Sequence, residues 1–229
     1  CFVSEDMYPQ TLALLRTRSE PIGIELVVGR LEDFIPDASF YAAMLQYPSA
    51  TGSVKDMTAF AASCESAGVK LAVAADLMAL TLLEAPGVWG AEVVFGSTQR
   101  LGIPMGFGGP HAAYFATKEA YKRHIPGRII GQSIDVEGKP ALRMALQTRE
   151  QHIKRAKATS NICTSQVLLA VMAGMYAVYH GPDGMKQIAS NMHDRARMLA
   201  ESLTAMGYQL RHQAFFDSLC IEADASLKA

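Results

Sequence analysis

The segment GSTQRLGIPMGFGGPHAAYFA, residues 96–116, contains the residues most suited to binding a ligand. Gly106, Gly108 and Gly109 could let backbone N–H groups approach a phosphate closely. The segment has no G-K-[ST] sequence and no helix pattern opens directly from it, so it is not a P-loop and only weakly resembles a dinucleotide fingerprint. A tight turn between two strands is the alternative, which we favour for a Gly-rich loop considered in isolation.

Asp76 is a second candidate, because it ends the apolar run VKLAVAAD. The carboxyl edge of a parallel sheet is where open α/β folds bind their ligands. A carboxylate there could pair with a cationic ring nitrogen or with a basic group. It could equally cap a helix over LMALTLLEAPG, and the sequence leaves both roles open.

A basic and polar cluster precedes the most apolar helix pattern of the chain. Arg155 and Lys157 could bind a carboxylate or a phosphate, although a solvated helix face is the simpler interpretation. Asn161 or Thr164 could cap the helix that follows. Cys163 would need a neighbouring base to act as a nucleophile, and the sequence identifies none.

Metal and disulfide chemistry are not indicated by the sequence. The four cysteines lie far apart without a CxxC pair, which excludes the usual zinc patterns and a disulfide framework. They are Cys1, Cys64, Cys163 and Cys220. The histidines show no metal-ligand spacing either, and His111 alone is a candidate because it stands beside the Gly-rich loop.

The composition indicates a folded protein with a sizeable core. Half of the 229 residues are hydrophobic and 19% are charged. A net charge of -1 gives no electrostatic reason to expect nucleic acid or a membrane surface. The longest apolar run, VLLAVMAGMYAV, is shorter than the roughly 20 residues of a membrane span. The chain starts without methionine and stops soon after a strand-like run, so we expect a fragment.

The first half of the chain alternates apolar runs with helical patterns, as βα units do. PQTLALLRTRSEPIG predicts a helix with Pro9 in its first turn, where the missing N–H group is tolerated. VKDMTAFAASCESAG predicts a helix that ends at Gly68. VKLAVAAD predicts a strand covered on both faces, and GAEVVFGS and AAYFAT predict two more strands.

The second half predicts a hairpin, two helices and two strands. GRIIGQSIDVEGKPALRMALQ indicates a β-hairpin that turns at Glu137-Gly138. Helices are expected from Thr164 to His180 and from Gly184 to Gly207, separated by HGPDG. We predict an α/β large domain over residues 1–182 and the start of a smaller α+β domain over residues 183–229.

The chain also resembles the P-protein family of the glycine cleavage system, the pyridoxal-phosphate-dependent glycine decarboxylases. The resemblance covers essentially the whole chain and rests on extended identities. These include VAADLMALTLLEAPGVWGAEVVFGSTQRLGIPMGFGGPHAAYFATKEAYKRHIPGRIIG, ALRMALQTREQHIKRAKATSNICTSQVLLA, YAVYHGP, PQTLALLRTRSEPIGIE and QYPSATG. One departure is Tyr8, where the family pattern DxHPQT has histidine.

The resemblance implies a fold-type I PLP-dependent transferase-like large domain, with a mostly parallel sheet and helices on both faces. It implies two homologous halves, of which the carboxyl half holds PLP through a lysine in a segment like HKTFCIPHGGGGPG. The shared Ile-Pro aligns Gln99 with that lysine, or Arg100 if the alignment slips by one residue. Neither residue has a nucleophilic amine, so the resemblance implies the amino-terminal, pseudo-catalytic half.

By the same resemblance, Gly108, Gly109 and His111 would lie toward the PLP of the other half, and no coenzyme is expected covalently in this chain. The implied partners are the carboxyl-terminal catalytic half or subunit, the lipoyl domain of H-protein, glycine as substrate and a second copy of the parent. Bacterial cytoplasm or the mitochondrial matrix is the expected compartment. A transaminase-like enzyme would need a Schiff-base lysine that the sequence lacks. A non-enzymatic dimerisation or docking module with a vestigial pocket is the other alternative.

Overall fold

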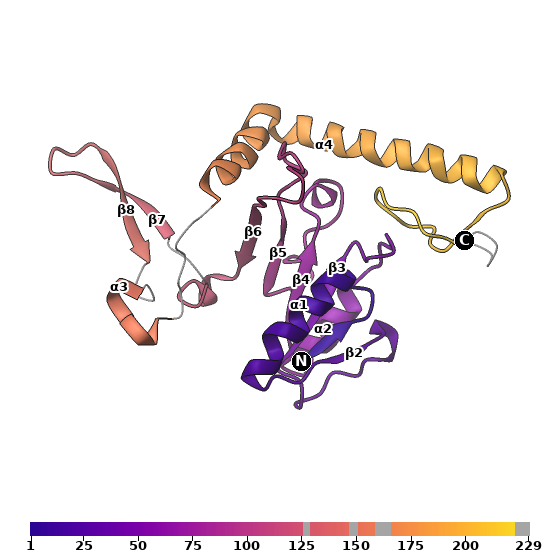
Figure 1. The fold of residues 1–229 in the computed structure, drawn as a ribbon, viewed down its shortest axis with the longest axis horizontal. Coiled ribbons are helices and arrows are strands. Elements are labelled where there is room, and N and C mark those ends of the chain that lie inside the picture. The colour runs from indigo at the N-terminus through magenta and orange to yellow at the C-terminus, as the bar shows by residue number, and fades with distance from the viewer. Residues whose placement is uncertain (126–128, 147–150, 159–165, 223–229) are drawn as a thin grey trace. The chain divides into compact units, whose positions relative to one another are not determined.

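The computed structural model describes residues 1–125, 129–146, 151–158 and 166–222 (Figure 1). The chain forms two compact units. Unit 1 comprises Cys1–Ala116 and Leu168–Ala229, and unit 2 comprises Thr117–Val167. The predicted division into residues 1–182 and 183–229 stays a prediction.

Unit 1 is built on a six-stranded sheet with the order β2-β1-β3-β4-β5-β6. The strands are β1 (Phe2–Ser4), β2 (Val27–Gly29), β3 (Ala42–Tyr47), β4 (Lys70–Ala75), β5 (Val93–Ser97) and β6 (Ala113–Thr117). Each of the pairs β1–β2, β1–β3, β3–β4 and β4–β5 is parallel. The predicted α/β class with a mostly parallel sheet is therefore confirmed.

One helix covers each face of the central strands, because alternate residues of a strand point to opposite faces. Leu45 and Val73 are buried in one cluster together with Cys64 of α2 (Thr58–Ser66). Val3 and Ala74 are buried in another cluster, which Leu12 and Leu15 of α1 (Pro9–Ser19) cover. This two-sided burial explains the almost continuous apolar sequence of β4.

The end signals of both helices are confirmed. Pro9 stands at the start of α1, and Gly68 follows α2 with φ +73°. Short 3₁₀ turns complete this part of unit 1: η1 (Glu20–Ile22), η2 (Leu31–Asp33) and η3 (Ala79–Thr81). The suggested helix over LMALTLLEAPG contains only η3, and β3 is a central strand that the sequence pattern did not identify.

A long bent helix, α4 (Val167–Ala205), follows in unit 1 (Figure 1). Gly181 interrupts it with φ 64° and ψ 179°, and Pro182 comes next. The two predicted helices separated by HGPDG are thus confirmed as two arms of one element. The two predicted strands after it are also present, as the antiparallel pair β9 (Gln209–Leu210) and β10 (Ile221–Glu222).

Unit 2 contains the predicted hairpin, formed by β7 (Ile129–Ile134) and β8 (Pro140–Leu146). Gly138 in its turn has φ +80°. The other described elements are η4 (Glu119–Tyr121), α3 (Gln151–Lys154) and η5 (Arg155–Lys157). The candidates Asn161, Cys163 and Thr164 lie outside the described residues.

Candidate functional site

Two carboxylates and one guanidinium meet at the carboxyl edge of the sheet in unit 1. Asp76 directly follows β4, and Arg100 lies in the turn after β5. The Nε atom of Arg100 lies 3.1 Å from Oδ2 of Asp76. Its Nη1 atom donates a hydrogen bond to Oδ2 of Asp217, which precedes β10. One side chain therefore bridges acidic groups from two distant parts of the sequence.

Asp76 has a basic partner, which is one of the two roles that its position suggested. The helix that it could have capped over LMALTLLEAPG is replaced by η3, whose N-cap is Met78, although Asp76 does accept a local backbone hydrogen bond. Its Oδ1 atom accepts from the N–H group of Met78 at 3.0 Å. Burial raises the pKa of the Asp76 carboxyl group. The charge of Arg100 and the N–H group of Met78 oppose this rise without cancelling it. The desolvation of this carboxylate thus outweighs the attraction of its ion pair.

Arg100 is held by its charge and by an aromatic ring. Burial lowers the pKa of its guanidinium, but the hydrogen bond to Asp217 and the negative charge of Asp76 raise it more, so that the pKa lies above its ordinary value. The guanidinium carbon lies 5.9 Å from the centre of the Phe216 ring, within the range of a cation–π contact. Arg100 is therefore a permanent cation at this edge.

Two tyrosines lie within electrostatic reach of these acids. The pKa of Tyr8 is raised by burial and then by the negative charge of Asp76, which the positive charge of Arg100 partly offsets. The hydroxyl of Tyr114 donates to the carbonyl of Ala75 at 3.0 Å. Burial and the charge of Asp76 raise the pKa of Tyr114 to about 12. Both phenols are protonated at neutral pH, and Tyr8 thus keeps a polar group where the family pattern has histidine.

Gln99 begins the turn after β5, beside Arg100. Its backbone N–H group donates to the hydroxyl of Ser97 at 3.1 Å. The preceding Thr98 is buried, and its hydroxyl has no hydrogen-bond partner within the part of the chain that the structure describes.

The described lysines of unit 1 are engaged elsewhere or stand on α4. Lys55 pairs with Glu32 at 2.6 Å. Lys70 begins β4, at the opposite edge from Asp76, and pairs with Glu92 at 3.1 Å. Lys186 belongs to the second arm of α4. In the described part of unit 1, the cation at Asp76 is therefore Arg100 and not a lysine amine.

The Gly-rich loop has an unusual backbone. Gly106, Phe107, Gly108 and Gly109 all have positive φ, with values of 56°, 56°, 104° and 142°. The N–H groups of Gly108 and Gly109 donate to the carbonyl of Met105 at 3.1 and 3.2 Å. Both groups are thus used within the loop, and their role toward a phosphate stays a prediction.

The tip of this loop is exposed. The side chain of Phe107 is fully exposed and that of Met105 is 77% exposed. A Cβ atom added to Gly109 would lie 3.6 Å from the ring of His111, which places that ring beside the loop. The loop therefore presents apolar side chains and a histidine to its surroundings.

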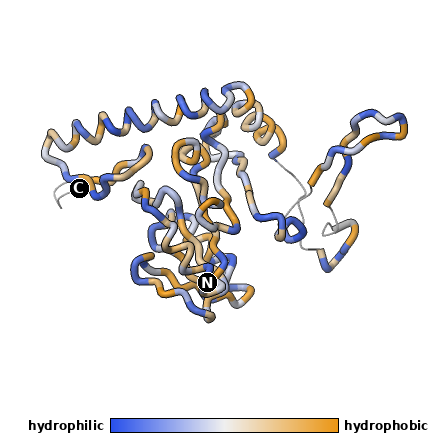
Figure 2. Tube along the Cα trace, turned by 180° about the vertical axis from the view of Figure 1, so that it is seen from behind, coloured by the Kyte–Doolittle hydropathy of each residue, from blue (hydrophilic) through white to orange (hydrophobic). Residues whose placement is uncertain are grey.

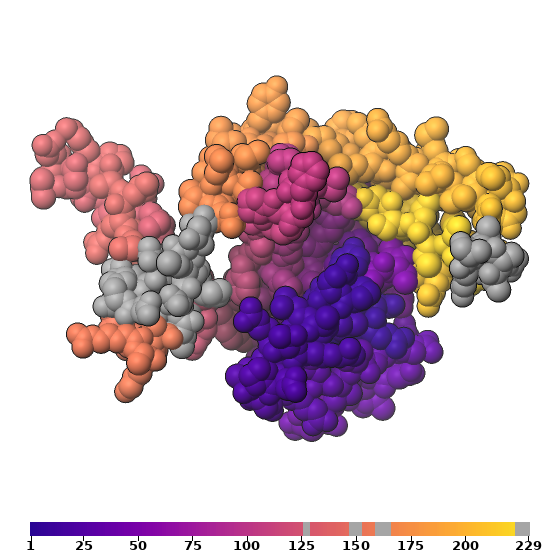
Figure 3. Space-filling model, in the orientation of Figure 1, coloured from indigo at the N-terminus to yellow at the C-terminus, as the bar shows by residue number. Residues whose placement is uncertain are grey.

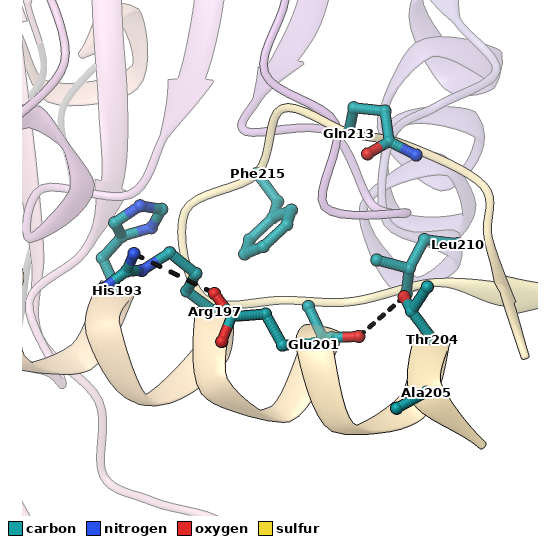
Figure 4. A pocket seen from close by; sticks show the side chains of 9 residues that line it. His193, Arg197, Glu201, Thr204, Ala205, Leu210, Gln213 and Phe215 are labelled. Atoms are coloured by element: carbon teal, nitrogen blue, oxygen red, sulfur yellow. Dashed lines mark hydrogen bonds and ion pairs between the residues drawn. The ribbon is translucent and has the colours of Figure 1, made fainter.

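A hollow of about 590 Å³ lies between the second arm of α4 and residues 210–215 (Figure 4). Its lining residues are His193, Arg197, Ala200, Glu201, Thr204, Ala205, Leu210, Gln213 and Phe215. Several of their polar groups already have partners. Arg197 lies 3.9 Å from Glu201, and the Thr204 hydroxyl donates to the carbonyl of Ala200 at 2.8 Å. His193 was not among the candidate residues, and its signal in the sequence is the helical spacing of its neighbours on α4.

The described residues contain neither a candidate metal-ion site nor a candidate membrane-spanning helix. Residues 1–125, 129–146, 151–158 and 166–222 contain no group of three or more His, Cys, Asp or Glu side chains arranged to hold a metal ion. Within the same ranges, no helix combines the length and the apolar composition of a membrane span.

The chain is similar in sequence to the glycine cleavage system P-protein family, whose sequence pattern matches residues 1–229. It is 59% identical over 221 residues to glycine dehydrogenase (decarboxylating) of Nostoc punctiforme, covering 96% of this chain and 23% of that protein. It is 60% identical over 224 residues to the protein of that name from Flavobacterium johnsoniae, covering 98% of this chain and 24% of that protein. The chain thus spans about a quarter of the length of these curated relatives.

Solved structures agree with this result. The crystal structure of glycine decarboxylase (P-protein) of the glycine cleavage system, in inhibitor-bound form, matches with a TM-score of 0.88 and 37% identity, over 94% of this chain and 51% of that chain. An aspartate aminotransferase from Thermus thermophilus matches with a TM-score of 0.63 and 15% identity, over 98% of this chain and 61% of that chain, which shows a shared fold. The predicted fold-type I transferase-like class is confirmed, and the chain belongs to the glycine cleavage system P-protein family.

Proposed function

We propose that the chain is part of the amino-terminal half of a glycine decarboxylase of the glycine cleavage system, the half without the lysine that binds PLP. The observation that carries this proposal is the cation at Asp76, which is the guanidinium of Arg100 and not a lysine amine. The names of the relatives, glycine dehydrogenase (decarboxylating), support the activity of the whole protein. PLP is the proposed coenzyme, held by a lysine in the carboxyl-terminal half. The chain alone would not decarboxylate glycine.

The groups at this edge do not fit a PLP molecule bound by the chain itself. The carboxylate that could hold a ring nitrogen, Asp76, is already paired with Arg100. The N–H groups of Gly108 and Gly109 donate to Met105. Bound to the other half, PLP would supply the electron sink for the loss of CO₂ from glycine.

The proposed contribution of the chain is to shape the interface with the carboxyl-terminal half. The first arm of α4 is mostly hydrophobic (Figure 2). Its exposed apolar residues include Leu168, Val171, Met175, Val178 and Tyr179. Exposed apolar faces of this kind are typical of protein contacts. In the proposal, Gly108, Gly109 and His111 lie toward the PLP of the other half.

The remaining partners follow from the proposed activity. Glycine is the substrate of the whole protein, and its aminomethyl group passes to the lipoyl arm of H-protein. A dimer of the parent protein is the proposed assembly. The bacterial relatives support a cytoplasmic location, and the mitochondrial matrix is the counterpart in a eukaryote.

Trapping of the coenzyme tests the central proposal. The whole protein that contains the chain is loaded with PLP, reduced with borohydride and digested, and the labelled lysine is identified by mass spectrometry. We expect the label on a lysine outside these 229 residues. A stoichiometric label on a lysine within the chain, absent when borohydride is added before PLP, would contradict the proposal.

The alternative is a non-enzymatic docking module with a vestigial pocket, and the exposed apolar arm of α4 favours it. The two candidates differ in what a local change in the chain does. In a pure docking module, a substitution in the Gly-rich loop leaves PLP retention by the assembled protein unchanged. In the proposed half-site, the same substitution weakens it.

A further inference from the structure

Arg100 connects three segments of unit 1 that are distant in sequence. Asp76 belongs to the turn after β4, Arg100 to the turn after β5, and Asp217 to the chain beyond α4. Arg100 contacts both acids at once, through Nε and through Nη1. The bridge therefore ties the carboxyl-terminal part of unit 1 to the sheet.

Residues 212–218, here called the closing segment, lie against the loop that follows β3. The N–H group of Val54 donates to the carbonyl of Ala214 at 3.0 Å. Ser53 and Phe215 form an isolated antiparallel bridge, and the hydroxyl of Thr51 lies 2.9 Å from Nε2 of His212. Figure 3 shows this yellow part of the chain beside the second arm of α4.

The closing segment is packed closely as well as hydrogen-bonded. A Cβ atom on Gly52 would lie 2.1 Å from the carbonyl oxygen of Ser218, so the two backbones touch directly. Phe216 is 2% exposed and shares a buried cluster with Met78 and Leu101. Asp217 is consequently held at the carboxyl edge of the sheet, beside Arg100.

The two carboxylates at this point repel each other unless a cation lies between them. Asp76 and Asp217 each have a side chain that is 21% exposed, and Arg100 is the cation that contacts both. Without Arg100, two carboxylates would share a partly buried site with no counter-ion, and their repulsion would act to release the closing segment. The guanidinium suits this task because its planar group offers separate N–H edges to the two acids.

We infer that Arg100 is a built-in cation that pairs with the candidate carboxylate Asp76 and, by bridging to Asp217, holds the closing segment against the sheet. The guanidinium of Arg100 thus takes the place that a bound cationic ligand would have beside Asp76. The closing segment is therefore held against the sheet without a ligand. The inference goes beyond the proposed function, since it concerns contacts of this chain and not the reaction of the whole protein.

Removal of Arg100 followed by chemical rescue tests the inference. In the whole protein, amide hydrogen exchange is measured by mass spectrometry on peptides that cover residues 51–54 and 212–218. We expect Arg100→Ala to accelerate exchange at Val54 and across the closing segment by at least about tenfold, because the bridge is lost. Methylguanidinium at low millimolar concentration should restore the protection with a saturable dose dependence. Methylammonium, a compact point charge, should restore much less.

Arg18→Ala is the matched control, because Arg18 is exposed in the last turn of α1 and belongs neither to the bridge nor to the hollow beside the closing segment. It should leave exchange in the closing segment at the wild-type rate. Exchange in Arg100→Ala that equals the wild-type rate would overturn the inference. Loosening that methylguanidinium does not reverse would overturn it too, because a specific cation site would then be absent.

A second variant keeps the test valid if Arg100→Ala does not fold. Asp217→Ala leaves the Asp76–Arg100 pair in place and removes only the acceptor that links Arg100 to the closing segment. We expect faster exchange in residues 212–218 of this variant, with unchanged exchange in β4. Wild-type protection of the closing segment in Asp217→Ala would overturn the inference. Borohydride mapping reports separately on the proposed function, so the two can fail independently.

Discussion

Asp76 shows how one half-buried carboxylate depends on one arginine. The ion pair with Arg100 is short, yet burial keeps the pKa of Asp76 above its ordinary value. The side chain of Asp76 is 21% exposed and that of Arg100 is 39% exposed, so solvent screens part of their attraction. The loss of Arg100 would leave the Asp76 carboxylate without this counter-ion at the carboxyl edge of the sheet.

The raised pKa of Asp76 predicts how the free energy of unfolding depends on pH, including the sign of the change. Because the pKa of Asp76 is raised in the folded state, the folded protein binds this proton more tightly than the unfolded chain does. The contribution of Asp76 to stability therefore rises as the pH falls through its folded pKa toward the ordinary value of about 3.9. The free energy of unfolding of the wild type, minus that of Asp76→Asn, should increase over this range in denaturant titrations.

Asp56→Asn provides a control with the opposite sign. Hydrogen bonds from the hydroxyl and the N–H group of Thr58 lower the pKa of Asp56, which is fully exposed. Its contribution is present above the ordinary pKa and is lost as the pH falls through the lowered value. The difference between wild type and Asp56→Asn should thus shrink in acid. A shrinking difference for Asp76→Asn would contradict the raised pKa.

At the scale of elements, the bend in α4 depends on one glycine. Gly181 has φ 64° and ψ 179°, a conformation that is accessible to glycine and strained for any residue with a Cβ atom. Pro182 follows and lacks the N–H group that a continuous helix would use. The apolar first arm and the mixed second arm of α4 can therefore point in different directions (Figures 1 and 2).

Gly181 at the bend and Gly174 in the first arm of α4 give a matched pair of substitutions. Gly181→Ala should lower the free energy of unfolding by about 1–2 kcal/mol, because alanine is strained at this φ. Gly174→Ala should raise it by about 0.5–1 kcal/mol, because Gly174 is helical and a Cβ atom there would meet open space. Thermal or urea unfolding measures both changes. Equal effects of the two substitutions would show that the bend does not require glycine.

At the scale of the whole protein, the Gly-rich loop is the part of the chain proposed to lie near the coenzyme of the other half. Gly109→Val should force the loop out of its conformation, because φ +142° is nearly closed to a β-branched residue. We expect the whole protein to lose PLP about ten times more readily in dialysis, followed by the absorbance of the bound coenzyme.

Gly138→Val is the control for backbone strain alone. Gly138 also has positive φ, at 80°, and nothing lies within 4 Å of an added Cβ atom. It belongs to the hairpin of unit 2 and not to the loop, so PLP retention should stay at the wild-type level. If Gly109→Val retained PLP as well as this control, the docking-module alternative would be favoured.

The sequence by itself determined much of the architecture, because its signals are local. Pro9 marks the start of one helix, Gly68 the end of another and Gly138 a turn, and each acts through the φ range that its own residue type allows. The apolar run before Asp76 predicted a buried parallel strand and a carboxylate at the edge where ligands bind. Gln99 and Arg100 stand where the family resemblance places the PLP-binding lysine, so the sequence also predicted that this chain holds no PLP covalently.

Only the tertiary structure shows which side chain pairs with the carboxylate of Asp76. Asp217 carried no signal in the sequence, because its role arises only when the closing segment folds back onto the loop after β3. Arg100 appeared as a possible replacement for a lysine, but not as the bridge between two acids. Pairing between residues so distant in the chain depends on long-range packing and on the burial that makes their charges matter, and neither is encoded in local spacing.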